Sequence, residues 1–452
     1  MAQFNNFGTD CIREMEYLIP AKAEVLTAFP NLLEVPGATH EFWTTVDIAG
    51  ADLYFFNAAG VALPYELVAI DTVATTGEYY VRSTLSNIAN NYIYMLWDGS
   101  NNLGNTPTDT WSGSYHLVYH GQQGAGNWTD STANGYTGTN TGVAAGVGKI
   151  GVCGDFERTE SDRIANAAAG NWEYTQAWTV AAWTKRENVG YDAFIGIAGR
   201  SLGAATYRGW DFNSDGGSTA GRIGVVIRNN ATPSLQVNAY TTNAYADTNW
   251  KHLAWSNSGS GTVAGQSVYV NGAGPVALTT SADTLAGNTI INAAAFSVGA
   301  VRNNLNFYDG LIDEVRIATV ARSANWVAAE YSNTNDASAW STLTTVPNII
   351  SIVPNSGQPG DPVTINVTGG LALQGAGTVT VGGVPIVITG WSWTVLTGNI
   401  PAGGVGPADV VLTNNDAHTD TDAGGWTFLP MGNVAQSHES ITSIGIANSI
   451  GI

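Results

Sequence analysis

The sequence has few charged residues, and most of them are acidic. Charged side chains make up 12% of its 452 residues, with 36 Asp and Glu against 16 Lys and Arg, and the formal net charge is −20. Only four lysines occur, and no run of basic residues is present. We therefore expect no electrostatic binding to nucleic acid or to an anionic membrane. Such an acidic composition suits a protein that stays soluble outside a cell.

Cysteine is equally scarce. Cys11 and Cys153 are the only two, and neither belongs to a CxxC pair or to a zinc-type spacing of Cys and His. Two interpretations stay open: two buried, unpaired thiols, or a disulfide that would require the first segment to pack against the second.

Long apolar runs are missing too. No stretch approaches the roughly 18 apolar residues of a membrane-spanning helix, so we expect no membrane insertion. The N-terminus, MAQFNNFGTDCIREMEY, lacks the basic start and apolar stretch of a secretory signal peptide. An extracellular type of composition without a signal peptide favours a protein that is released by lysis of the cell, as virion proteins are.

Glycine, small polar residues and aromatic residues dominate what is present. The chain has 54 Gly, 15 Trp and 18 Tyr, and 44% of it is hydrophobic. This mixture is typical of many short strands joined by polar turns. The predicted fold class is all-β, a series of tandem β-sandwich domains.

The first predicted unit, residues 1–112, is a β-rich domain. It resembles an uncharacterised domain family that often precedes laminin-G-like modules in large prokaryotic surface proteins. No chemistry is assigned to that family. The matching stretches, in order, are TAFPNLLEV, ADLYFFNAAGVALPYEL, YYVRSTL and NYIYMLW.

The second unit, residues 113–335, resembles the laminin-G-like jelly roll of concanavalin-A type. In WTVAAWTK, residues 178–185, apolar side chains occur on both faces, as expected for a strand within two stacked sheets. The matching landmarks are YHLVYHG, DSTANGYTGT, GKIGVCGDFE, WTVAAWTKR, NWKHLAW, SVYVNG, FSVGA and YDGLIDEVRIATVARSANW.

The third unit, residues 346–430, resembles the immunoglobulin-like IPT/TIG domain, usually a spacer or interaction module. Its DNA-binding relatives use basic loops, whereas this segment has no Lys or Arg. Residues 431–452 follow as a tail with an uncharged, apolar end, predicted either to be an assembly arm or to dock onto its own chain. The tail residues considered for assembly are Ile441, Ile444, Ile446, Ile450 and Ile452.

No constellation of residues predicts catalysis, so we expect a non-enzymatic protein with no catalytic or cofactor-binding residues. Laminarinase-like enzymes share the jelly roll but place their carboxylates as E-x-D-x-x-E, a spacing absent here. A G-x-S-x-G motif is also absent. His116 and His120 form a metal-type pair, but no third ligand can be placed, which favours structural histidines.

One aspartate is unexpected in its position. In the strand predicted for GLIDEVRIA, residues 310–318, alternation places Leu311, Asp313, Val315 and Ile317 on one face, and Ile312, Glu314 and Arg316 on the other. A carboxylate in an apolar row is expensive to bury. The jelly-roll resemblance implies that Asp313 helps to hold a structural calcium ion, which would require further oxygen ligands such as Asp155 or a backbone carbonyl of GDFE. The alternative is that backbone N–H groups, or Arg158, satisfy Asp313.

Two groups of loop residues are candidates for glycan contact, because sugar sites on jelly rolls use aromatic faces together with Asn and Asp side chains. The alternative is that the aromatic residues belong to the core. The first group is Tyr207, Arg208, Trp210 and Asp211. The second is Asn303, Asn304, Asn306 and Tyr308.

Three functions fit these patterns. The first is a structural or adhesive component of an extracellular particle, in particular a bacteriophage capsid decoration, fibre or tail protein on the virion surface. Its partners would be copies of itself, other proteins of the particle, and a surface glycan. The second is a bacterial cell-surface or filament adhesin, and the third is a secreted, calcium-dependent carbohydrate-binding protein.

Overall fold

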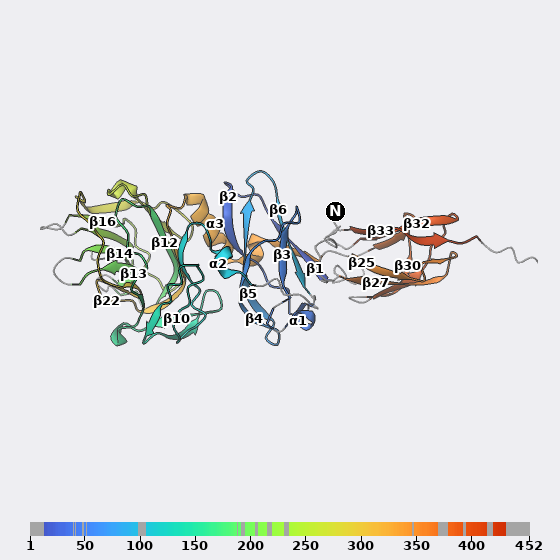
Figure 1. The fold of residues 1–452 in the computed structure, drawn as a ribbon, viewed down its shortest axis with the longest axis horizontal. Coiled ribbons are helices and arrows are strands. Elements are labelled where there is room, and N and C mark those ends of the chain that lie inside the picture. The colour runs from blue at the N-terminus through green and yellow to red at the C-terminus, as the bar shows by residue number, and fades with distance from the viewer. Residues whose placement is uncertain are drawn as a thin grey trace, which may run out of the picture. The chain divides into compact units, whose positions relative to one another are not determined.

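The computed structural model describes residues 13–430, apart from short internal segments (39, 41, 48, 51, 98–104, 188, 191–194, 204–206, 215–218, 230–234, 346–347, 369–377, 392–394 and 414–418). The chain divides into two compact units, Met1–Thr345 and Val346–Ile452. Strands dominate both units (Figure 1). The predicted all-β fold class is confirmed.

The N-terminal domain, the part of the first unit up to Trp111, consists of two facing sheets. One has the strand order β24-β1-β6-β3 and the other β2-β5-β4. Its helices are α1 (Phe42–Thr45) and α2 (Pro107–Thr110). Its strands are β1 (Arg13–Ile19), β2 (Leu26–Leu32), β3 (Tyr54–Asn57), β4 (Tyr65–Asp71), β5 (Thr76–Leu85), β6 (Asn91–Trp97) and, from much later in the chain, β24 (Thr342–Thr345).

The central domain follows with two large sheets. One has the order β18-β17-β12-β23-β10-β9, with β7 also paired to β23, and the other has the order β19-β16-β15-β14-β13-β20-β11-β8. A small β21–β22 pair completes it. The strands are β7 (Tyr115–Tyr119), β8 (Thr139–Thr141), β9 (Ala144–Val147), β10 (Val152–Phe156), β11 (Arg163–Asn166), β12 (Trp178–Arg186), β13 (Ile195–Ser201), β14 (Gly209–Ser214), β15 (Gly224–Arg228), β16 (Gln236–Thr241), β17 (Lys251–Asn257), β18 (Gln266–Val270), β19 (Leu278–Asp283), β20 (Phe296–Val298), β21 (Ala300–Val301), β22 (Asn306–Phe307) and β23 (Gly310–Ala318).

Strand β12 is buried on both faces, as its sequence predicts. Trp178, Val180 and Ala182 lie in the core between the two large sheets. Ala181 points the other way, into a small cluster with Val327 of the following helix. The central sheet therefore has a second covered face, on the side of the N-terminal domain.

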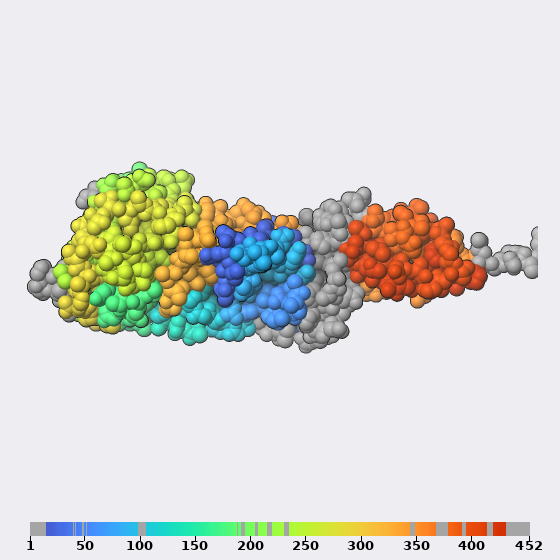
Figure 2. All heavy atoms as spheres, turned by 90° about the horizontal axis from the view of Figure 1, so that it is seen from above, coloured from blue at the N-terminus to red at the C-terminus, as the bar shows by residue number. Residues whose placement is uncertain are grey.

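Helix α3 (Ala324–Asn335) supplies that cover and joins the two domains. Ser323 caps its N-terminus, accepting the Trp326 N–H at 3.0 Å. Trp326 belongs to the core of the N-terminal domain and packs edge-on against Phe29 at 5.1 Å. The short helix α4 (Ala337–Trp340) then leads into β24, which pairs with β1. Figure 2 shows this orange segment between the yellow central domain and the blue N-terminal domain.

The second compact unit is a two-sheet β-structure. Its sheets have the orders β25-β27-β31-β30 and β26-β33-β32-β28-β29, and they enclose a core of aliphatic residues with Trp426 and Phe428. The strands are β25 (Asn348–Val353), β26 (Ser356–Gly357), β27 (Pro362–Thr368), β28 (Thr378–Val381), β29 (Val384–Pro385), β30 (Val387–Trp391), β31 (Val395–Asn399), β32 (Gly406–Thr413) and β33 (Thr419–Phe428).

Candidate functional site

Strand β23, which carries the unexpected aspartate, contains a bulge. Arg316 pairs with Ala181 of β12 but Asp313 pairs with Trp183, so β23 has one more residue than β12 between these pairs. Glu314 lies in the bulge with a φ of +51°. An extra residue of this kind resets the alternation of side chains along a strand.

The predicted alternation is therefore wrong at this point. Ile312 packs in the central core together with Val315 and Ile317, although strict alternation assigns it to the opposite face. Asp313 is fully buried, and its Oδ2 accepts the Ile150 backbone N–H at 3.0 Å. Burial, followed by the charge of Glu314, raises the pKa of Asp313 well above its usual range.

Beside the bulge lies a buried network of charged side chains centred on His120, which directly follows β7. Its Nδ1 is 2.7 Å from Oε1 of Glu314, and its Nε2 is 3.0 Å from Oε2 of Glu66. Arg316 donates to Glu314 Oε2 at 2.6 Å and to Glu330 Oε1 at 3.1 Å. All five side chains are at least nine-tenths buried.

The network connects the two domains. Glu66 of β4 and Glu78 of β5 come from the N-terminal domain, whereas His120 comes from the central domain. Glu66 also accepts the Ser131 hydroxyl at 2.6 Å, and Glu78 accepts the Gln122 amide at 2.5 Å. These two hydrogen bonds, and the contact between Glu66 and His120, cross from one domain to the other.

Aromatic rings enclose the network. Tyr80 stacks on the His120 ring with centroids 5.1 Å apart and an angle of 23° between the planes. The Arg316 guanidinium lies 5.1 Å from the Tyr80 ring centre and 4.9 Å from that of Trp111. The Trp111 indole N–H also donates to Glu66. These rings exclude water, so the charges interact in a medium of low polarity.

Burial and mutual pairing oppose each other in setting the protonation states. Burial alone would lower the pKa of His120, but Glu314 and Glu66 outweigh it and raise that pKa well above the ordinary value. For Glu314, burial is outweighed by His120 and Arg316, which lower its pKa to about 2. Glu78 has its pKa raised well above normal by burial and by Glu314. Without a bound metal, pairing therefore favours the charged forms of His120, Glu314 and Glu66, whereas burial favours the neutral form of Glu78.

His116 does not join this network, so the two histidines of the YHLVYH stretch have different surroundings. The Nε2 of His116 accepts the Gly170 backbone N–H at 3.1 Å, and its ring packs against Trp172 and Tyr136. Burial lowers the pKa of His116. These contacts are those of a structural histidine.

Asp155, the other predicted calcium ligand, belongs to a separate group of acids at the edge of the central domain. Its ligand atoms and those of Glu157 and Glu187 all lie within 4.8 Å of one another. Burial together with Asp162 and Asp309 raises the pKa of Asp155. Asp313 is not a member of this group. A calcium ion shared by Asp313 and Asp155 stays a prediction, whereas the backbone hydrogen bond to Asp313 is present.

Three of the residues predicted to contact a glycan are buried, and that part of the prediction is wrong. Trp210 is only 1% exposed, lies in the central core, and stacks on Trp172 at 5.7 Å. Asp211 and Tyr308 are each 1% exposed as well. Trp210 and Asp211 fall within the inner strand β14, where side chains on both faces are covered.

The remaining predicted glycan residues lie at or near the surface. The Tyr207 ring sits between two arginines, 5.6 Å from Arg228 Cζ and 4.9 Å from Arg302 Cζ. Both guanidinium groups also lie near the buried Asp211, at 3.7 and 3.8 Å. Of the other predicted residues, Arg208, Asn304 and Asn306 are half-buried, and Asn303 is exposed.

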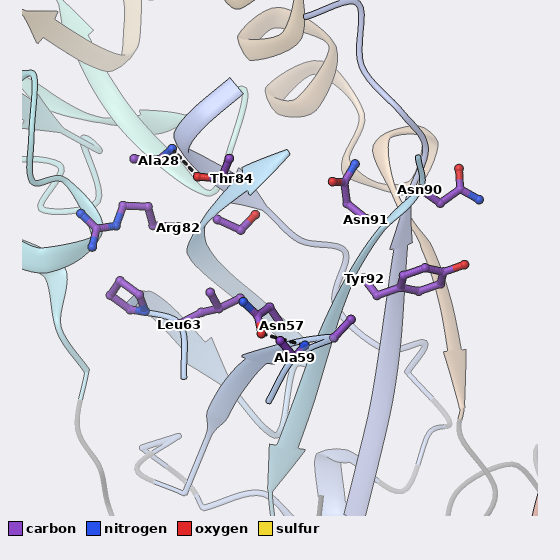
Figure 3. A pocket seen from close by; sticks show the side chains of 12 residues that line it. Ala28, Asn57, Ala59, Leu63, Arg82, Thr84, Asn90, Asn91 and Tyr92 are labelled. Atoms are coloured by element: carbon purple, nitrogen blue, oxygen red, sulfur yellow. Dashed lines mark hydrogen bonds between the residues drawn. The ribbon is translucent and has the colours of Figure 1, made fainter. Parts of the chain in front are cut away.

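A polar groove in the N-terminal domain was not predicted. It has a volume of about 650 Å³ and opens between β5 and the ends of β3 and β6. Figure 3 shows Arg82 and Thr84 on one side, Asn91 and Tyr92 on the other, and the turn at Asn57 below. The lining residues are Ala28, Asn57, Ala58, Ala59, Leu63, Pro64, Arg82, Ser83, Thr84, Asn90, Asn91 and Tyr92.

The groove offers amides, hydroxyls, one guanidinium group and one phenol. Its Asn residues also shape the walls: Asn57 accepts the N–H groups of Ala59 and Val61, each at 3.0 Å, and so holds its turn. Asn90 is exposed at the rim. The sequence feature that could have indicated the groove is the polar run ANNY, residues 89–92, at the start of the predicted strand NYIYMLW. The sequence alone could not show that this run lies opposite Arg82.

Other parts of the site prediction lie beyond the residues that the structure describes. These are the assembly residues Ile441, Ile444, Ile446, Ile450 and Ile452, and also Cys11. Cys153 is buried as a free thiol, and burial raises its pKa to about 12.

Comparison with known families identifies the central part of the chain. Residues 158–328 match the family model described as the concanavalin A-like lectin/glucanases superfamily, of laminin-G type. The central domain is concanavalin A-like. The two flanking resemblances drawn from the sequence stay predictions. None of the curated proteins matches the chain significantly.

Solved structures share weaker similarity with this chain. Domain 4 of an extracellular GH43 arabinanase from Geobacillus stearothermophilus is 20% identical, with a TM-score of 0.34, over 48% of this chain and 97% of that one. The binding domain of Paraclostridial Mosquitocidal Protein 1 is 13% identical, with a TM-score of 0.37, over 67% and 64%. The receptor-binding domain of botulinum neurotoxin type G is 13% identical, with a TM-score of 0.34, over 69% and 66%. Scores this low support no conclusion about function.

Within the described residues, no helix is both long and apolar enough to cross a membrane.

Proposed function

We propose that the protein is a non-enzymatic adhesive and structural component of an extracellular particle. In its most specific form, the proposal is a bacteriophage virion protein: a capsid decoration, fibre or tail protein. The concanavalin A-like domain, the predominance of β-structure and the acidic composition support it. The observation that carries the adhesive part is the polar groove of the N-terminal domain.

The chemistry of the groove suits binding rather than catalysis. Its lining offers Asn57, Asn90 and Asn91 as amide donors and acceptors, with Arg82 and Tyr92 beside them. Such groups can hydrogen-bond to the hydroxyls of a glycan. The described lining contains no Asp, Glu, His or Cys, so it offers neither the carboxyl pair of a glycosidase nor a carboxylate or histidine base to activate the Ser83 and Thr84 hydroxyls.

The most strongly perturbed acids also favour a structural role. Glu78 and Asp313 have the raised pKa values that a general acid would need, but they are 4% and 0% exposed. A substrate cannot reach them between the two domains. Their shifts follow from burial in a domain junction, which is a common structural cause.

A glycan array with the full-length protein tests the adhesive function. The variant Asn90→Ala/Tyr92→Ala removes two groove side chains near the rim, and Tyr207→Ala removes the ring between the two arginines of the concanavalin A-like domain. We expect the wild type and Tyr207→Ala to retain a bacterial surface glycan and the double variant to lose at least about tenfold in affinity. Loss with Tyr207→Ala alone would move the site to the central domain, and no binding by the wild type would refute the adhesive function.

Light scattering tests the structural part of the proposal. A particle component is expected to form a discrete oligomer or polymer. Deleting residues 431–452 should abolish that association and leave the circular dichroism spectrum of the folded domains unchanged. If the shortened protein assembles as the full-length protein does, the tail is not an assembly arm.

A further inference from the structure

Three metal-ligating side chains converge within the buried network. Glu78 comes from β5, His120 follows β7, and Glu314 comes from β23, so the three reach one place from two domains. One ligand atom of each lies within 4.8 Å of the other two. The three residues are 4%, 4% and 2% exposed.

One of these ligand atoms lacks the partner that a buried acid normally has. Oε1 of Glu78 has no hydrogen bond to any described residue, and its polar neighbour there is Nδ1 of His120 at 3.9 Å. A buried carboxyl oxygen without a partner loses hydration without compensation. Because Oε2 of Glu78 is occupied by the Gln122 amide, Oε1 is the atom left facing the histidine.

The opposite side of each ligand is held by another residue. His120 Nε2 contacts Glu66, Glu314 Oε2 accepts from Arg316, and Glu78 Oε2 accepts from Gln122. Partners of this kind orient the ligands of metal sites, and a carboxylate on the far nitrogen of a histidine is the most frequent example. Here they direct Nδ1 and two Oε1 atoms toward one point.

We propose that Glu78, His120 and Glu314 bind a divalent cation of the zinc class, which fastens the N-terminal domain to the concanavalin A-like domain. Ligands around tetrahedral zinc stand about 3.3 Å apart, given bonds of roughly 2.0–2.1 Å. The distances from His120 Nδ1, 2.7 Å to Glu314 and 3.9 Å to Glu78, lie on either side of that value. Small rotations of two glutamate side chains would equalise them.

The choice of metal follows from the donor atoms. An imidazole nitrogen with two carboxylate oxygens suits Zn²⁺, whereas Ca²⁺ takes oxygen ligands only. The proposed site therefore differs from the predicted calcium site at Asp313 and Asp155 in both residues and metal. The proposed metal site shares no residue with the groove, so a negative result for metal binding would leave the proposed adhesive function untouched, and the reverse also holds.

Metal analysis of the full-length, tag-free protein tests the proposal. The variant Glu78→Gln removes one ligand charge but keeps the shape of the side chain and an acceptor for Gln122. Glu187→Gln is the matched control, because Glu187 is exposed and belongs to the other group of metal-ligating side chains. After refolding with Zn²⁺ and gel filtration, we expect about one zinc per chain in the wild type and the control, and a loss of at least about tenfold in Glu78→Gln.

Cobalt provides a second readout that does not depend on a variant. Co²⁺ in this site should show visible absorption of a low-coordinate complex with nitrogen and oxygen ligands, and added Zn²⁺ should displace it. The proposal is overturned if the wild type retains no zinc after refolding, or if Glu187→Gln loses the metal while Glu78→Gln keeps it. Equal retention by all three proteins overturns it as well.

Discussion

Nδ1 of His120 and Oε1 of Glu314 lie 2.7 Å apart in a junction from which water is excluded. The histidine is the first residue after β7, and the glutamate occupies the bulge of β23, the strand with which β7 pairs. The bulge therefore shapes the junction between the two domains as well as the strand itself. It places a carboxylate of the central domain where the N-terminal domain supplies Glu66 and Glu78.

The Arg316 guanidinium neutralises this junction, and its removal should be strongly destabilising. In Arg316→Met, Glu330 would lose the Arg316 donor and Glu314 would be left with His120, and both carboxylates would remain buried. Breaking a buried pair in this way costs about 3–5 kcal/mol. Chemical denaturation measures the loss. The pair Lys251–Asp247 supplies the control, because its aspartate is exposed and Lys251→Met should cost less than about 1 kcal/mol. Equal effects would contradict the buried-pair account.

Asn333 of α3 acts as a strand partner for β2. Its Oδ1 accepts the Leu32 N–H at 2.8 Å and its Nδ2 donates to the Leu32 carbonyl at 2.7 Å. Asn333→Ala leaves both backbone groups buried without a partner, which should cost about 2–4 kcal/mol in the free energy of unfolding. Asn335→Ala, an exposed position on the same helix, should change it by less than about 0.5 kcal/mol. A small loss in Asn333→Ala would mean that water replaces the amide.

His252 should make the protein less stable in acid. Burial lowers its pKa to about 4, and Arg316 of β23 adds to this effect while Glu330 of α3 opposes it. The ring packs against Trp183 and Tyr331. Because the folded pKa lies below the unfolded value of about 6.5, protonation favours the unfolded chain, and the stability present above pH 6.5 falls as the pH decreases toward 4.

The expected loss is about 3 kcal/mol over that range, from the difference between the two pKa values. Denaturation curves at several pH values measure it. The variant His252→Asn should lack this part of the pH dependence, whatever its stability at pH 7. An unchanged pH dependence in the variant would show that other groups, such as His116, account for the acid sensitivity.

The acidic group at the edge of the central domain provides the test of the predicted calcium ion. Glu187 and Asp155 raise the pKa of Glu157, and burial, Asp309 and Asp155 raise that of Glu187, so negative charges accumulate here. Added Ca²⁺ should therefore raise the Tm, and Asp155→Asn should weaken that response. If the ion is shared with Asp313 as predicted, Asp313→Asn should weaken the response as well. An unchanged response in Asp313→Asn would assign the ion to the acidic group alone. Thermal denaturation with Ca²⁺ or EDTA distinguishes these outcomes.

Local patterns predicted much of the framework. The two-sided apolar pattern of WTVAAWTK correctly indicated a strand covered on both faces. Such patterns succeed because period and burial are properties of consecutive residues. Such patterns were less reliable for single residues. Trp210 is an aromatic residue of the kind that stacks on sugars, but it lies within a buried strand and belongs to the core.

The bulge at Glu314 shows why the candidate sites escaped prediction. One extra residue in β23 is visible only when its pairing with β12 is known. The metal-type group joins residues 78, 120 and 314, and the groove joins residue 57 to residues 82–84 and 90–92. No local pattern links positions so far apart, because their proximity results from strand pairing and domain packing.

The amino-acid sequence alone determined that this is an acidic, all-β protein with a concanavalin A-like domain in its centre, because composition, alternation and ordered motifs are local. Tertiary structure decided which polar residues are buried and which face solvent. It also decided that a helix and a strand from beyond the central domain would complete the N-terminal one. The physical reason is that the free energy of a charged side chain depends on what surrounds it, and for His120 and Glu78 those surroundings come from distant parts of the chain.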